Sequence, residues 1–342
     1  MFGLPPHEGL EEFNFENTPH RQDRWGSLKW DKYEGKDVIP MWVADMEFPA
    51  APVILEALRD RIEHGVFGYT SPTPGVKGAV VRYLKTRHAL TEAKEEWLFF
   101  SPGVVQSLTA ACAMLPEKSA VMVFTPSYPP FFNTPEYNDR EVVTLALDRA
   151  SGQWNLDWEA MDAAIKDNPN IRLLMLCNPH NPVAGKVFSE EELKQVGEFC
   201  EEHDLILVAD EIHCDLVLDE DVKHTCMLAV DGGRFAKRTI LLNAPSKTYN
   251  IPGLGCSYAV IPNKELRLAF RKVGWITTNP TLGYTACEAS YDKGESWRQA
   301  LLAHLRGNRD FLYHFLETRL PEVKVDPMHA TYLAWLDVRE LG

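Results

Sequence analysis

A lysine and an acid each stand at the end of a short apolar segment, in positions suited to covalent chemistry. Lys247 follows the segment 239–242 and has a hydroxyl neighbour, Ser246. Asp210 follows the segment 205–209. A lysine amine can bond a cofactor aldehyde, and an acid beside a pyridine nitrogen keeps that nitrogen protonated, so that the ring withdraws electrons. The pair therefore indicates Schiff-base chemistry on pyridoxal phosphate.

Two further segments supply groups that such a cofactor needs. Asn181 lies in the Pro-flanked turn 178–182, where its amide can donate to the ring oxygen. Val104 and Val105 open a predicted helix soon after the apolar segment 97–100. Free backbone N–H groups and the helix dipole at that point can hold a phosphate. Each group alone is common in proteins, but the groups taken together favour a cofactor site over solvated side chains.

With these groups in place, the chain resembles the fold type I enzymes that use pyridoxal phosphate, in the class I/II aminotransferase superfamily. Within them it is most similar to the carbon-sulfur lyase branch, the cystathionine β-lyases. The segments that carry this closer match run in family order along the chain: 24–31 (RWGSLKWD), 42–48 (WVADMEF), 65–70 (GVFGYT), 125–132 (TPSYPPFF), 210–213 (DEIH) and 331–337 (TYLAWLD).

The resemblance implies a role for each residue around the cofactor ring. Lys247 is expected to bond the aldehyde and to move protons. Asp210 is expected to hold the ring nitrogen, and Asn181 the ring oxygen. Tyr128 is expected to stack on one ring face while Ile212 packs against the other.

The resemblance also implies ligands for the phosphate and for the substrate, a sulfur-containing L-amino acid. The expected phosphate ligands are Ser246, the amides of Val104 and Val105, and Tyr69 of a second subunit. Because Tyr69 would act across a subunit interface, a homodimer is expected. Asp45 and His213 are expected on the substrate side.

The reaction implied is cleavage of L-cystathionine or a related cysteine S-conjugate to a thiol, pyruvate and ammonia. Lys247 would remove the Cα proton. Transamination by a class I/II aminotransferase uses the same residues and stays open, as does a regulatory or binding protein with secondary catalysis. Many aminotransferases carry a phosphate-clamping arginine eight residues after the lysine. Here that position is Gly255, which favours the lyase branch.

The family implies further chain beyond Gly342, including an arginine that pairs with the substrate α-carboxylate. None of the arginines of this sequence aligns with it. A carboxylate buried without a cation costs several kcal/mol, so the 342-residue chain is expected to bind cofactor but to process amino acids poorly. If it does process them well, Arg24 or another arginine is the expected substitute.

The alternation of apolar segments and helical patterns predicts an α/β protein with a mostly parallel sheet in a three-layer α/β/α large domain. The large domain is expected at 47–282. A smaller α/β domain is expected from both chain ends, 1–46 and 283–342. The predicted strands are 97–100, 120–124, 142–145, 172–176, 205–209, 239–242 and 257–261, with a further strand at 332–338. Ser189 opens a helix to His203 with a capping box.

Composition narrows the partners and the compartment. A net charge of −14 argues against nucleic acid and anionic membrane surfaces as partners. No apolar run is long enough for a transmembrane helix, and the first residues lack the pattern of a secretory signal. Seven scattered cysteines without a CxxC motif favour reduced thiols in a cytoplasm. Four possible ligands, His213, Cys214, His224 and Cys226, lack repeated zinc-type spacing, so no metal site is predicted.

Overall fold

The computed structural model describes residues 13, 15, 26–149, 153–183, 185–274 and 280–342. Seven strands form one sheet in the order β1-β7-β6-β5-β4-β2-β3. They are β1 (Leu98–Ser101), β2 (Ala120–Thr125), β3 (Glu141–Ala146), β4 (Ile171–Cys177), β5 (Ile206–Asp210), β6 (Thr239–Asn243) and β7 (Ser257–Val260). Each strand end lies within one residue of the sequence prediction.

The strand directions bring the chemical segments to one edge of the sheet. β7 pairs antiparallel with both β1 and β6. The successive pairs β6–β5, β5–β4, β4–β2 and β2–β3 are all parallel. β1 therefore runs in the same direction as the parallel strands. As a result, the carboxyl ends of β1, β4, β5 and β6 share an edge, which is where open α/β sheets bind ligands.

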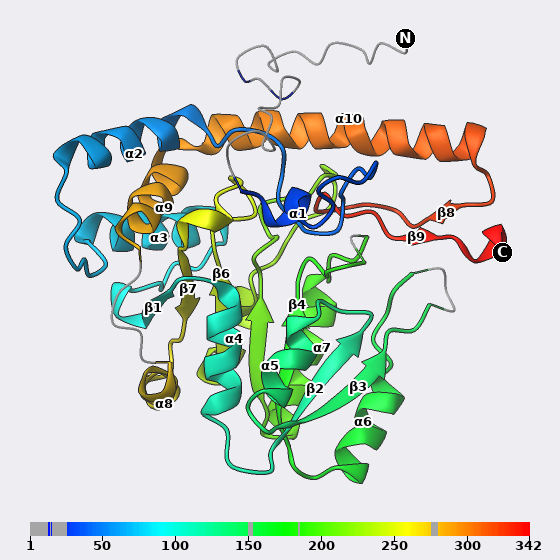
Figure 1. The fold of residues 1–342 in the computed structure, drawn as a ribbon. Coiled ribbons are helices and arrows are strands. Elements are labelled where there is room, and N and C mark those ends of the chain that lie inside the picture. Colours follow the sequence, from blue (N-terminus) through cyan, green and yellow to red (C-terminus); the bar gives the residue numbers. More distant parts are fainter. Residues whose placement is uncertain (1–12, 14, 16–25, 150–152, 184, 275–279) are drawn as a thin grey trace.

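Helices cover both faces of the sheet (Figure 1). The helices of the described residues are α1 (Leu28–Asp31), α2 (Pro52–His64), α3 (Pro74–Arg87), α4 (Val104–Ala113), α5 (Pro130–Glu136), α6 (Trp158–Asp167), α7 (Glu190–Glu202), α8 (Lys264–Val273), α9 (Thr281–Lys293) and α10 (Glu295–Arg319), with short 3₁₀ segments η1 (Glu95–Trp97), η2 (Met227–Lys237), η3 (Pro252–Leu254) and η4 (Arg339–Leu341). The predicted capping box is present, because Ser189 and Glu192 each accept the other's backbone N–H. Within the described ranges, no helix has the length and apolarity to cross a membrane.

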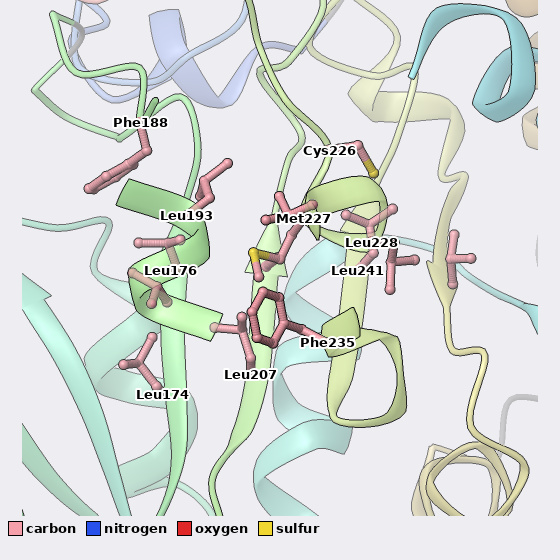
Figure 2. Packing of buried hydrophobic residues seen from close by; sticks show 14 of the residues in the cluster. Leu174, Leu176, Phe188, Leu193, Leu207, Cys226, Met227, Leu228, Phe235 and Leu241 are labelled. Carbon is pink, nitrogen blue, oxygen red and sulfur yellow. The ribbon is translucent and has the colours of Figure 1, made fainter. Parts of the chain in front are cut away.

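Side chains of the central strands alternate between two buried layers. On one face, Leu174 and Leu207 pack with Phe235 of η2 and the apolar side of α7 (Figure 2). On the other face, Leu173 packs with residues of α4, α5 and α8. A strand buried on both faces must be apolar at successive positions, which explains why these strands read as continuous apolar runs in the sequence. The three-layer architecture predicted from the sequence is confirmed.

A third apolar cluster lies beyond the carboxyl edge of the sheet. Ile54 of α2 packs there with Trp297 and Leu301 of α10, the long helix that runs along the top of the molecule in Figure 1. Tyr249 and Ile251, which follow Lys247 directly, belong to the same cluster. The turn that carries the lysine is thus anchored in the packing between the sheet and these helices.

The strand predicted from Tyr332 to Val338 is wrong in its length. Only Leu336–Asp337 (β9) is a strand, and it pairs with β8 (Lys324–Val325). Thr331 adopts a positive φ of 65°, and its hydroxyl accepts the backbone N–H of Leu333 at 3.1 Å. This local turn withdraws the residues after Thr331 from the sheet ladder, so the apolar run there does not produce an extended strand.

Candidate active site

Lys247 lies in the turn that follows β6, with a half-buried side chain. Its Nζ donates a hydrogen bond of 2.7 Å to the carbonyl oxygen of Ala44. Burial lowers the pKa of Lys247, while the carboxylates of Asp45 and Asp210 act in the opposite direction. A lowered pKa increases the fraction of neutral amine near pH 7, which is the form that attacks an aldehyde and accepts a proton.

Asp210 ends β5 and is only 3% exposed. One of its oxygens, Oδ1, accepts the backbone N–H of Ile212 at 3.1 Å. The pKa of Asp210 is raised to about 7, chiefly by burial and to a smaller extent by the Glu211 charge, while the Ile212 hydrogen bond and Lys247 act in the opposite direction. A carboxylate this basic is suited to share a proton with a pyridine nitrogen.

Asn181 is half-buried in the loop that follows β4. The preceding residue, His180, is 1% exposed, and its Nε2 lies 2.8 Å from the carbonyl oxygen of Pro126. This contact ties the loop of Asn181 to the segment that carries Tyr128. The pKa of Tyr128 is raised by burial and by the Asp210 charge, so its ring lies near the acid. Sequence reasoning missed His180, although it stands inside the Pro-flanked turn.

Val104 and Val105 are the first two residues of α4, as predicted. Three buried hydroxyls hold the turn in front of them. The Oγ of Ser101 lies 2.9 Å from the Oγ of Ser107 and 2.7 Å from the Oγ of Ser257. The cluster fixes the end of β1 against α4, and so it orients the helix N-terminus whose amides can hold a phosphate.

Gly255 stands where many aminotransferases have the clamping arginine, and the structure gives a physical reason for a glycine there. Its φ is +68°, in the left-handed region that side chains other than glycine rarely adopt. An added Cβ would lie 3.2 Å from Cγ of Pro280 and 3.6 Å from the carbonyl oxygen of Pro102. The space beside Gly255 is therefore filled by neighbouring chain.

His213 lies on the lysine side of Asp210 with 1% exposure. Among the described residues, neither of its ring nitrogens has a hydrogen-bond partner. Burial, followed by the nearby charge of Lys247, lowers the pKa of His213 to about 3. Its ring centroid lies 6.3 Å from that of Tyr332, whose hydroxyl donates to the Ala44 carbonyl at 3.2 Å. His213 is thus a neutral buried imidazole close to the lysine.

Asp45 lies between Lys247 and a second lysine that sequence reasoning did not single out. The Nζ of Lys29 is 3.4 Å from Oδ1 of Asp45 and 2.7 Å from Oε1 of Glu47. Lys29 is buried, so its charge is compensated by these two carboxylates. The only signal in the sequence was its place in the segment 24–31, whose residues Arg24 and Trp25 lie outside the described residues.

Ser246 and Tyr69 have different surroundings. Ser246 is half-buried and closes the lysine turn, because its carbonyl accepts the N–H of Ile251 at 3.0 Å. Tyr69 is 97% exposed and lines an open hollow of about 840 Å³ together with Pro102 and Leu254. A side chain this exposed makes little contact with its own chain, so the structure does not bring Tyr69 to the buried lysine and acid.

One cluster of metal-binding residue types occurs among the described residues. Ligand atoms of His88, Cys214 and His224 lie within 4.8 Å of one another. Both nitrogens of His224 face other polar groups, Nε2 the carboxylate of Glu211 at 3.0 Å and Nδ1 the amide of Asn178 at 3.4 Å. Hydrogen bonding accounts for this imidazole, and we assign no metal to the cluster. The absence of a metal site stays a prediction.

Residues 36–341 match the family described as aminotransferase class I and II. The chain belongs to this family. It is 39% identical to cystathionine beta-lyase PatB of Bacillus subtilis (strain 168) over 337 residues, which cover 95% of this chain and 86% of the relative.

Two solved structures have the same fold with a TM-score of 0.90. Cystalysin from Treponema denticola, which contains a pyridoxal 5'-phosphate cofactor, is 34% identical and is matched over 96% of this chain and 84% of its own. A PLP-bound putative aminotransferase from Clostridium difficile 630 is 36% identical, over 96% and 86%. The predicted family and fold class are confirmed.

Proposed function

We propose that the protein is a carbon-sulfur β-lyase dependent on pyridoxal phosphate, which cleaves L-cystathionine or a related cysteine S-conjugate to a thiol, pyruvate and ammonia. The observation that carries this proposal is that the Lys247 amine and the buried carboxylate of Asp210 lie at the carboxyl edge of the sheet, close enough for the charge of each to shift the pKa of the other. The similarity to a relative named cystathionine beta-lyase supports the lyase reaction.

The residues of the site fit the cofactor. An acid with a pKa of about 7 matches a pyridine nitrogen, a half-buried amine matches the aldehyde, and the N-terminus of α4 matches the phosphate. We assign Asp210 to the ring nitrogen, Asn181 to the ring oxygen, and Tyr128 and Ile212 to the two ring faces. The phosphate ligands in this proposal are the amides of Val104 and Val105, Ser246, and Tyr69 of a second subunit. When bound, pyridoxal phosphate supplies an electron sink for the Cα carbon of the substrate.

The proton transfers belong to Lys247. With cofactor and substrate bound, the neutral lysine amine would take the Cα proton, which its lowered pKa favours. The β-carbon to sulfur bond would break with its electron pair on sulfur, and the lysine ammonium could give its proton to the leaving thiolate. Asp210 would hold a proton at the ring nitrogen. We place Asp45 and His213 on the substrate side, because both lie near Lys247. The charge of Asp45 raises the pKa of Lys247, and the charge of Lys247 lowers the pKa of His213.

We propose a homodimer in which a second copy covers the hollow around Tyr69. Exposed apolar side chains occur on the loop that borders the hollow. They are Val66 (63%), Phe67 (54%) and Tyr69 (97%). The hollow also borders Pro102, which stands in the turn directly before the phosphate-binding amides of Val104 and Val105. A tyrosine from the partner copy can therefore reach the phosphate of the neighbouring site.

The proposal also includes the predicted domain division and the predicted cellular location. The domain division into 1–46, 47–282 and 283–342 groups the chain ends around α10 and the third apolar cluster. A cytoplasmic location agrees with the seven cysteines, all of which are buried and unpaired.

Transamination is the second candidate, because one of the structures with the same fold is named a putative aminotransferase. One assay separates the two reactions. Purified protein is incubated with L-cystathionine and pyridoxal phosphate, without any keto acid, and pyruvate and free thiol are measured. A lyase releases both in equal amounts and repeatedly. A transaminase without an acceptor stops after one turnover per site, and that result would remove the lyase proposal.

A further inference from the structure

We propose that Glu211 is a positioning residue. Through His224 and Asn178 it holds Asp210 and Asn181 in fixed relation to each other, so that the ring nitrogen and the ring oxygen of the cofactor are bound together. This inference rests on the cofactor placement proposed above.

Glu211 joins three segments at the carboxyl edge of the sheet. Its side chain is 1% exposed. Oε1 accepts the backbone N–H of Met227 at 2.7 Å, and Met227 lies in the apolar cluster of Figure 2. The backbone N–H of Glu211 donates to the carbonyl oxygen of Leu242, at the end of β6, at 2.9 Å. A buried carboxylate needs such donors, because an unpaired buried charge is strongly unfavourable.

His224 relays the orientation of Glu211 to the next loop. Its Nε2 lies 3.0 Å from Oε2 of Glu211, and its Nδ1 lies 3.4 Å from Nδ2 of Asn178. The Oδ1 of Asn178 accepts the backbone N–H of Phe188 at 3.0 Å, so its amide nitrogen must be the group that faces His224. An amide nitrogen only donates, so Nδ1 accepts and the ring proton stays on Nε2, directed at the carboxylate.

The same groups contact the residues assigned to the ring. The backbone N–H of Asn178 donates to the carbonyl oxygen of Asp210 at 2.9 Å, and Asn178 begins the loop that carries Asn181. Glu211 follows Asp210 directly, and its charge is one of the causes that raise the pKa of Asp210. A negative charge beside this contact also favours a proton there, between Asp210 and a pyridine nitrogen. Geometry and charge therefore act on the same contact.

Replacing Glu211 by glutamine should disturb this chain of hydrogen bonds without changing its volume. If the glutamine oxygen still accepts the Met227 N–H, the glutamine amide nitrogen faces Nε2 of His224. Because both groups would then be donors, the ring proton of His224 must move from Nε2 to Nδ1. Nδ1 would next face the donor amide of Asn178, and turning that amide would break its bond to Phe188. We expect the dissociation constant for pyridoxal phosphate, measured by tryptophan fluorescence, to rise about tenfold, the weight of one hydrogen bond to a charged group.

A double-mutant cycle tests whether Glu211 acts through the two ring contacts. In a background that lacks both, Asp210→Ala with Asn181→Ala, Glu211→Gln should change the dissociation constant less than threefold. An equal tenfold loss in this background and in the wild-type background would overturn the proposal, because the effect would then be independent of the ring contacts. Glu198→Gln, which removes an exposed carboxylate 3.0 Å from Arg234, is the matched control and should leave cofactor affinity unchanged.

Variants of His224 keep the proposal testable if Glu211→Gln does not fold, which thermal unfolding of the cofactor-free protein reports. His224→Gln retains a donor toward Glu211 and should bind pyridoxal phosphate within about threefold of the wild type. His224→Leu removes the donor and should lose about tenfold. Equal affinity in these two variants would also overturn the proposal. Failure of the wild type itself to bind the cofactor would count against the proposed function instead.

Discussion

The amine of Lys247 donates a hydrogen bond of 2.7 Å to the carbonyl oxygen of Ala44, which lies 203 residues earlier in the chain. The hydroxyl of Tyr332 donates to the same oxygen at 3.2 Å. One carbonyl group therefore joins the lysine turn to segments near both ends of the chain. The position of the amine depends on the packing of these end segments against the sheet as well as on the turn after β6.

Lys247→Ala should abolish pyruvate release from cystathionine and should remove the adduct with pyridoxal phosphate that borohydride traps. The reason is that alanine can neither bond the aldehyde nor move the Cα proton. Mass spectrometry of tryptic peptides after reduction checks the position of the adduct. Lys166→Ala, at an exposed position on α6, is the control and should keep both properties. A trapped adduct on another lysine in Lys247→Ala would contradict the assignment.

Asp210→Asn should make the stability of the cofactor-free protein less dependent on pH. The pKa of Asp210 is raised from 3.8 to about 7, so the native state binds more protons than the unfolded state between these values. The stability that the protonated acid contributes is full below 3.8 and is lost as the pH rises through about 7. Asparagine resembles the neutral acid and escapes this loss.

The unfolding free energy of Asp210→Asn relative to the wild type should therefore rise from pH 4 to pH 8, by at most about 4 kcal/mol. Thermal or urea unfolding across this pH range measures the difference. A difference that stays constant with pH would show that Asp210 does not titrate in this window.

Mixed dimers should reveal whether Tyr69 acts across the proposed subunit interface. Tyr69→Phe subunits and Lys247→Ala subunits are each expected to form defective sites on their own. In a hybrid of the two, one site combines an intact lysine with an intact partner tyrosine, so part of the activity should return. Tagged subunits allow the hybrid to be purified and assayed. A pure hybrid without any regain would place Tyr69 in the site of its own subunit or in neither.

Gly255→Arg should weaken cofactor binding, although it restores the arginine found at that position in many aminotransferases. A side chain other than glycine at a φ of +68° costs about 1–2 kcal/mol, and the Cβ would press on Pro280 at 3.2 Å. We expect a lower unfolding midpoint and a higher dissociation constant for pyridoxal phosphate. Gly232→Arg, at a φ of +65° with open space around its Cβ, is the control and should leave cofactor affinity unchanged. Tighter binding by the arginine variant would refute the steric argument.

The sequence by itself determined the strands and the positions of the chemical groups just after them. The apolar runs of the central strands had to be buried on both faces, and several runs are followed by a residue that we assign to the cofactor, such as Asp210 after β5 and Lys247 after β6. Local patterns suffice for this, because strand burial and helix capping are recorded over a few neighbouring residues. The extended strand expected at 332–338 did not form over its full length, because a local turn at Thr331 interrupts the apolar run.

Only the tertiary structure decided which distant groups surround the site. The bond from Lys247 to Ala44, the contact of His180 with Pro126 and the relay from Glu211 to Asn178 each join separate segments. Contacts between such distant residues cannot be recognised from a pattern in one sequence, because they depend on how the strands are ordered in the sheet. The filled space beside Gly255 is likewise created by Pro280, a residue from another part of the chain.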